Sequence, residues 1–188
     1  MTATLAVEKE KLEKPPLDLH YLGDRVLRQP AKRIAKVDES VRKLAKEMLQ
    51  TMYSSNGIGL AAPQVGVNKQ LIVIDCEPNK PEEDTALVLI NPQITRFGKE
   101  MCVVEEGCLS IPNVYLDVTR PKEIEVTYKD ENGRPQKLQA DGLLARVIQH
   151  EMDHLNGVMF VDRVDNGLAL TEALKKNGFS LQSVKPVA

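Results

Sequence analysis

The sequence predicts a single domain of the α+β class, with antiparallel-rich β-sheets around a central helix. Its length of 188 residues is that of one domain. Hydrophobic residues make up 42% and charged residues 28%, an ordinary globular composition that supports a core without disulfides. Helical and strand-like patterns both occur along the chain, and no repeat or linker divides it into two halves.

Three segments have the apolar periodicity of helices. The first follows Asp38, a candidate N-cap, and runs to about Ser54. The second covers residues 142–155 and the third roughly residues 168–176. An Asn-Gly pair, typical of helix ends, follows each segment closely.

Strand-like segments fill the region between the first two helices. In residues 123–128 apolar and charged residues alternate, which is typical of a half-buried antiparallel strand. Asn132-Gly133 predicts a hairpin turn that returns the chain through residues 136–140. The other predicted strands are residues 70–76, 86–91 and 101–104.

Both ends of the chain are expected to lie outside the domain, which covers residues 17–178. Residues 1–16 carry mixed charges and end in Pro-Pro, which predicts a flexible leader, and residues 179–188 are expected to form a loose tail. The leader resembles neither a secretory signal nor a transit peptide, and no apolar run is long enough for a membrane helix. With three cysteines and a net charge of −2, the chain is expected to be cytoplasmic and to bind neither membranes nor specific nucleic-acid sequences.

The most informative motif is His-Glu-x-x-His at residues 150–154, inside the second helical segment. His150 and His154 lie one turn apart, so both can bind one divalent metal ion from the same helix face. Glu151 can then take a proton from a water whose pKa the metal has lowered to ~7. The motif therefore predicts metal-assisted hydrolysis of a carbonyl compound.

A catalytic metal site of this kind needs a third protein ligand and an open position. One metalloprotease pattern is excluded, because Phe160 occupies its final ligand position. Cys108 is a candidate, since Gly107 and Pro112 would hold its segment in a defined conformation directly after a strand. Downstream acidic residues are the alternative. They are Asp162, Asp165 and Glu172.

Three segments resemble the signature motifs of the peptide deformylase family, of the bacterial and organellar-like type. They are GIGLAAPQ at 57–64, EGCLS at 106–110 and QHEMDH at 149–154. They occur in the family's order, and the resemblance covers roughly residues 17–175. It implies a hydrolase that removes the N-formyl group from the N-terminal formylmethionine of newly made polypeptides and releases formate.

The resemblance also implies the roles of the site residues. A water activated by the metal would attack the formyl carbon, with Glu151 as general acid/base. The side-chain amide of Gln64 and the backbone N–H of Leu109 would stabilise the oxyanion. Fe²⁺ is the implied ion, with Ni²⁺ or Co²⁺ tolerated, although thiolate and imidazole ligands alone favour Zn²⁺. The implied metal ligands are Cys108, His150 and His154.

The same motifs are expected to bind the substrate. Gly57 and Gly59 leave room for a peptide backbone near the metal, and main-chain pairing accepts many sequences. Tyr115 stands where a number of family members have arginine, and Arg146 where others are apolar. The residues expected to line the substrate site are Gly57, Ile58, Gly59, Glu106, Gly107, Ile111, Tyr115, Leu143 and Val147.

Two other functions stay open from the residues alone. An endopeptidase would use an acidic third ligand, and a structural metal site would be closed by Cys102 or Cys76. The resemblance favours the deformylase. Its implied partners are N-formylmethionyl nascent peptides and the ribosome near its exit tunnel.

Overall fold

The computed structural model describes residue 5, residues 7–80 and residues 85–187. The strands are β1 (Gly59–Ala61), β2 (Leu71–Ile74), β3 (Leu87–Phe97), β4 (Met101–Cys108), β5 (Ile111–Pro121), β6 (Glu123–Lys129) and β7 (Pro135–Asp141). The helices are α1 (Glu39–Ser54), α2 (Gly142–Leu155) and α3 (Gly167–Lys176). Short 3-10 turns are η1 (Arg25–Arg28), η2 (Ala62–Val65), η3 (Phe160–Arg163) and η4 (Leu181–Ser183).

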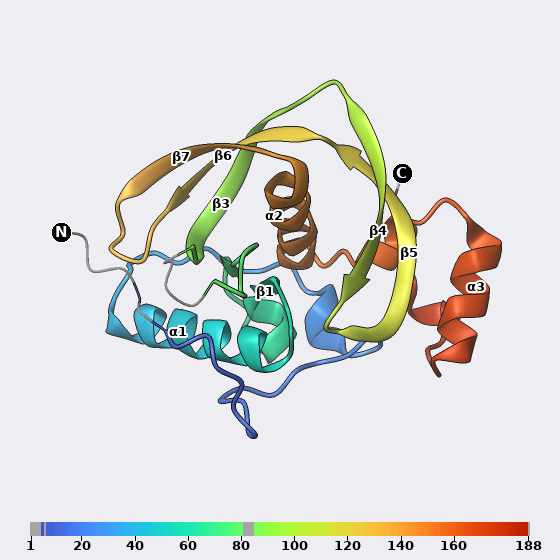
Figure 1. Ribbon diagram of the computed structural model, residues 1–188, viewed down its shortest axis with the longest axis horizontal. Helices are drawn as coiled ribbons and strands as arrows, with labels where there is room; N and C mark the ends of the chain where they lie inside the picture. Colours follow the sequence, from blue (N-terminus) through green and yellow to red (C-terminus); the bar gives the residue numbers. More distant parts are fainter. Residues whose placement is uncertain (1–4, 6, 81–84, 188) are drawn as a thin grey trace.

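The predicted fold class is confirmed. Five strands form one antiparallel sheet in the order β1-β2-β3-β6-β7, and β4 and β5 form a second, two-stranded sheet. Figure 1 shows α2 between the arch of β3, β6 and β7 and the β4–β5 pair, with α1 along the opposite side. The motif-bearing helix is therefore the central element of the domain.

Local sequence signals explain the two long helices. The Asp38 side chain accepts a hydrogen bond from the backbone N–H of Val41 at 3.2 Å, so α1 begins where the cap predicted. The apolar stripe of α1, including Met48 and Leu49, is completely buried against β1 and β2. In α2, Ile148 is fully buried against the other face of the five-stranded sheet.

The β4–β5 pair is where the predicted strands were wrong. The predicted strand at residues 101–104 continues to Cys108, because β4 pairs with β5 from Met101↔Pro121 through Gly107↔Tyr115. No strand was predicted for β5 itself. Its alternation of buried and exposed residues is interrupted by Asn113, which has a φ of 63°. Cys108 therefore ends a strand and does not lie in the loop after it.

Two further boundaries differ from the predictions. The expected loop after α1 contains β1, whose Gly59 pairs with Ile74 of β2. The strand predicted at residues 86–91 extends to Phe97, because β6 pairs along its second half with two register shifts. The remaining predicted strands and helices lie within a few residues of their predicted bounds.

Both chain ends contact the domain. In the leader, Glu10 accepts a hydrogen bond from the Gln50 side chain through its carbonyl oxygen at 2.7 Å. In the tail, the backbone N–H of Lys185 donates to the Asp162 carboxylate at 2.7 Å. Parts of both predicted segments, residues 1–4, 6 and 188, lie outside the described residues. Within the described part of the chain, no helix has the length and apolar character to cross a membrane.

Candidate metal centre

Three potential metal ligands converge where α2 meets the end of β4. Cys108, His150 and His154 each offer one ligand atom, and these atoms lie within 4.8 Å of one another. The thiol Sγ of Cys108 and Nε2 of His154 are 3.3 Å apart. This is the only such group in the part of the chain that the structure describes. The two histidines come from one helix face, as the motif predicted.

The alternative third ligands lie elsewhere. Asp162 forms an ion pair with Arg28, and Asp165 and Glu172 are exposed. Cys102 contacts Arg120 and Arg146 instead of the histidines. Burial raises the pKa of the Cys76 thiol to about 11, which disfavours the thiolate that a metal needs. Among the candidates, Cys108 is therefore the one that lies beside both histidines.

The chemistry of the donor set fits a divalent ion and a reacting water. Burial lowers the pKa of His154 well below its usual value, which keeps the imidazole neutral, as a metal ligand must be. One carboxylate oxygen of Glu151, Oε2, is buried and has no hydrogen-bond partner within the described part of the chain. Burial also raises the pKa of Glu151 to about 7. A carboxyl group with that pKa can both accept and donate a proton near neutral pH.

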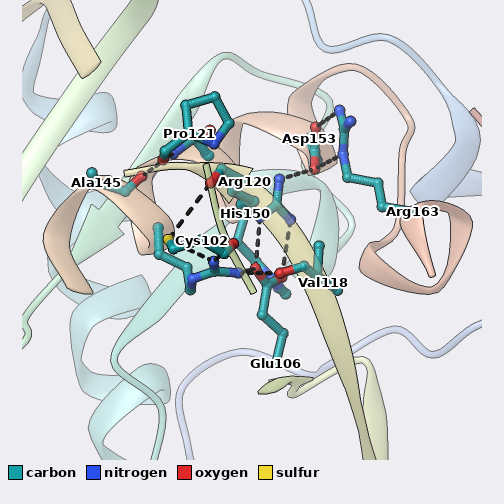
Figure 2. Close-up of polar contacts among 11 residues, drawn as sticks. Cys102, Glu106, Val118, Arg120, Pro121, Ala145, His150, Asp153 and Arg163 are labelled. Atoms are coloured by element: carbon teal, nitrogen blue, oxygen red, sulfur yellow. Dashed lines mark hydrogen bonds and ion pairs between the residues drawn. The ribbon is translucent and has the colours of Figure 1, made fainter. Parts of the chain in front are cut away.

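A buried network of ion pairs and hydrogen bonds contacts His150 through its Nδ1 atom (Figure 2). The Glu106 carboxylate accepts hydrogen bonds from Nδ1 of His150 at 2.9 Å, from Arg120 at 2.6 and 2.9 Å, and from Arg146 at 2.6 Å. Burial alone would raise the pKa of Glu106, but the bonds from Arg120 and His150 outweigh it, and the pKa is strongly lowered. The carboxylate is therefore ionised and holds the imidazole in one orientation.

The sequence analysis missed the continuation of this network. Arg120 also donates to Asp153 at 2.8 Å, and Asp153 is held in turn by Arg163 at 2.6 Å. Figure 2 shows this chain of contacts running from β5 through α2 to η3. A signal was present, because Arg120 occupies a buried position in the alternation of β5 that Leu116 and Val118 share. A charge at such a position requires a buried partner.

Hydrogen bonds hold the Gln64 side chain with its amide nitrogen toward the candidate metal centre. Its Oε1 accepts a hydrogen bond from the backbone N–H of Ala61 at 2.8 Å, and its Nε2 donates to Ser110 Oγ at 3.1 Å. Nε2 also lies 3.5 Å from Cys108 Sγ. The residue is 1% exposed and belongs to η2. These contacts assign the amide orientation that an oxyanion donor needs. Ser110 was not predicted.

A cavity of about 530 Å³ opens beside these groups. Its lining includes Gln64, Cys108, Leu109, His150, Glu151 and eight of the expected substrate-site residues, Gly57, Ile58, Gly59, Glu106, Gly107, Tyr115, Leu143 and Val147. The lining residues that were not expected are Ser55, Asn56, Glu105, Pro112, Asn113 and Arg146.

Ile111 was expected to line the substrate site, and its position contradicts this. Its side chain is fully buried in a hydrophobic cluster with Val114 and Phe160, so it is not part of the cavity lining. Glu106 does line the cavity, but its carboxylate is occupied by the network around His150.

Two glycines allow close approach inside the cavity. A Cβ at Gly59 would collide with the Glu151 carboxylate and lie 2.8 Å from Cγ1 of Val147. A Cβ at Gly107 would lie 2.5 Å from the ring of Tyr115, which faces it across the β4–β5 pair. Glycine at position 59 therefore lets α2 bring Glu151 directly against β1.

The fold and the site are those of a metal-dependent hydrolase in which one central helix carries two histidines and a buried carboxylate. Comparison with known proteins identifies it further. The family model for polypeptide deformylase matches residues 16–168. The chain therefore belongs to the polypeptide deformylase family and is a hydrolase that acts on N-formyl groups.

Individual relatives support this assignment, two of them over the whole chain. A peptide deformylase from Synechocystis sp. is 77% identical over 188 residues, and one from Microchaete diplosiphon is 70% identical, each match covering 100% of both chains. The crystal structure of a peptide deformylase from Synechococcus elongatus in complex with actinonin is 67% identical, with a TM-score of 0.95 over 96% of this chain and 98% of that chain. The Thermotoga maritima peptide deformylase has a TM-score of 0.74 at 40% identity, covering 79% of this chain and 97% of that chain.

Proposed function

We propose that this enzyme removes the N-formyl group of nascent polypeptides with Glu151 as the general acid/base. The observation that carries the proposal is the position of the Glu151 carboxylate. It is buried beside Cys108, His150 and His154, and one of its oxygens has no hydrogen-bond partner among the residues that the structure describes. A raised pKa of about 7 suits a group that must first accept and then release a proton.

Cys108, His150 and His154 would hold the metal ion. When bound, a divalent ion supplies a Lewis acid and lowers the pKa of a water toward ~7. We propose Fe²⁺ first, on the resemblance to the family, and Zn²⁺ second, because soft thiolate and imidazole ligands suit it, with Ni²⁺ or Co²⁺ as substitutes.

Glu151 would move the proton in both halves of the reaction. It first accepts the proton of the water that attacks the formyl carbon. It then donates this proton to the departing amine nitrogen, and formate and a free N-terminal methionine are released. One residue can serve both steps because its surroundings are apolar enough to make the two protonation states similar in free energy.

The developing oxyanion would be stabilised by two donors. Gln64 Nε2 points toward the Cys108 end of the cavity, held there by its bonds to Ala61 and Ser110. The backbone N–H of Leu109 would be the second donor. Loss of one such donor typically lowers the rate by ~10²–10³.

The substrate backbone would bind beside β1. This strand is at the edge of the five-stranded sheet, and its residue Gly59 and the preceding Ile58 line the cavity. An edge strand can pair with an extended peptide through main-chain hydrogen bonds, which leaves selectivity to one side-chain pocket. Val147 and Leu143 are apolar lining residues suited to a methionine side chain. Action near the ribosomal exit tunnel and a cytoplasmic location are further predictions of the family resemblance.

Formate release from a formyl-Met tripeptide tests the proposal. The expected result is formate from the metal-loaded protein, with no cleavage of internal peptide bonds in an acetylated peptide of the same sequence. An endopeptidase would give the opposite pattern, and its activity would survive Cys108→Ser. A structural metal site would give neither product, and chelation would unfold the protein.

A further inference from the structure

The side chain of Lys9, in the leader segment, is buried in the domain. Its Nζ forms an ion pair with Asp75 at 2.8 Å, and the two side chains are only 7% and 0% exposed. The same ammonium group donates to Thr85 Oγ1 at 2.8 Å. An ammonium group has three donors, and burial leaves few of them to water. Such an arrangement fixes the lysine more firmly than a surface ion pair would.

Asp75 is a hub for several segments. Its carboxylate accepts hydrogen bonds from Tyr53 at the end of α1, from Thr85 at 2.6 Å and from the backbone N–H of Glu77 at 2.9 Å. Within the part of the chain that the structure describes, Lys9 contributes the only cation among the groups that contact this carboxylate. A buried carboxylate that loses its cation is strongly destabilised.

The hub is directly connected to the substrate site. The backbone N–H of Asp75 donates to the carbonyl oxygen of Ile58 at 2.9 Å. Asp75 follows β2, whose Ile74 pairs with Gly59 of β1. The ion pair between Lys9 and Asp75 therefore also constrains the stretch of chain that lines the cavity.

The leader is also attached to the helix that precedes this stretch. The backbone N–H of Leu12 donates to Ser54 Oγ at 3.1 Å, and the Gln50 side chain donates to the carbonyl of Glu10 at 2.7 Å. Both partners belong to the C-terminal half of α1, just before Gly57. The leader thus bonds to the chain on both sides of residues 57–59.

The leader lies outside the part of the chain that defines the family. The family model matches residues 16–168, so it begins at the last residue of the leader. Asp75 belongs to the family domain but takes its cation from outside it. Without the leader, this buried carboxylate would keep its hydrogen bonds from Tyr53, Thr85 and Glu77 but would lose the cation that pairs with it.

We propose that residues 7–16 form a brace on the substrate-binding strand β1, with Lys9 as a positioning residue that acts through Asp75. The brace holds Ile58 and Gly59 in the extended conformation that a peptide backbone can pair with. This role rests on the proposed function, because it concerns how the peptide of that reaction is bound. Lys9 itself does not line the cavity.

The test compares Lys9→Met with Lys11→Met in the full-length, metal-loaded protein. Lys11 is an exposed lysine of the same segment and serves as the matched control. We expect Lys9→Met to raise KM for a formyl-Met tripeptide about fivefold, with kcat within about twofold of the parent value. This pattern is expected because the variant would weaken substrate binding equally in the ground state and the transition state. Amide hydrogen exchange in residues 57–61 should become faster, and Lys11→Met should match the parent in both measurements.

A double variant distinguishes the loss of the brace from the effect of leaving the buried Asp75 carboxylate without a cation. Lys9→Met combined with Asp75→Asn removes the ion pair without leaving a buried charge, so it should fold even if the single variant does not. The brace predicts that the raised KM and faster exchange persist in the double variant. Recovery of both parent values would overturn the proposal, as would unchanged exchange in Lys9→Met. If the parent released no formate, the proposed function would fail, but the exchange measurement would still test the brace.

Discussion

Glu106 accepts a hydrogen bond from Nδ1 of His150 at 2.9 Å, and this contact joins β4 to the centre of α2. The bond sets the tautomer of the imidazole and leaves Nε2 for a metal ion. Because Arg120 of β5 and Arg146 of α2 hold the same carboxylate, the orientation of His150 depends on two strands, β4 and β5, that are distant from it in sequence. The candidate metal centre is thus part of the packing of the domain.

Glu106→Gln should weaken metal binding. The amide keeps the shape of the side chain but loses the charge that pairs with two arginines, so the support of His150 weakens. We expect the metal affinity to fall by about 10-fold, at the lower end of the usual effect of such partners. Competition with a chelator measures it. Glu105→Gln, a change of the exposed neighbour on the same strand, is the control and should bind as tightly as the parent. Equal affinities for all three proteins would contradict the supporting role of Glu106.

Gly59→Ala should impair catalysis more than folding. The added Cβ would meet the Glu151 carboxylate and Val147, so either β1 or α2 must shift. A displacement of this kind at a reacting group can cost about 10²-fold in kcat/KM. Gly167→Ala is the control, because a Cβ there meets no atom within 4 Å. Parent-like kinetics of Gly59→Ala would show that the close approach of Glu151 to β1 is not needed.

Asp75 should make the protein sensitive to acid. Burial alone would raise the pKa of Asp75, but the hydrogen bonds from Lys9 and Thr85 outweigh it and the pKa is lowered. A carboxylate with a lowered folded-state pKa stabilises the fold above its unfolded pKa, and this stabilisation is lost as the pH falls through the folded value. The free energy of unfolding should therefore decline from about pH 5 downward.

Urea unfolding at several pH values checks this dependence. Asp75→Asn should be less stable than the parent at pH 7 and should lose less stability between pH 6 and pH 3. Asp117→Asn, at an exposed position of β5, should retain the parent's dependence. An identical acid-induced loss in Asp75→Asn and the parent would rule out the carboxylate as its source.

Local signals predicted the catalytic helix well. Asp38 and the Asn-Gly pairs mark helix ends through short-range chemistry, and His150 and His154 share a helix face by spacing alone. The third ligand could not be chosen from spacing, because Cys108 meets α2 only through tertiary packing. In the sequence, only the family resemblance favours Cys108 as this ligand.

Sequence patterns could not predict contacts between residues that are distant in the chain. Arg120 meets Glu106 through strand pairing, and no periodicity specifies the partner of a buried charge. Asn113, with its positive φ, interrupts the alternation of buried and exposed residues in β5, so the sequence pattern did not predict this strand. The leader has no apolar periodicity, so the sequence did not predict the burial of Lys9 against Asp75.

The most direct test of the account is to measure metal content and formate release together in Glu151→Gln. Glu151 is assigned to proton transfer and not to metal binding. We therefore predict that the variant retains one metal ion per chain and releases formate about 10²–10⁴-fold more slowly than the parent. Loss of the metal, or formate release at the parent's rate with the metal bound, would contradict the central role of Glu151.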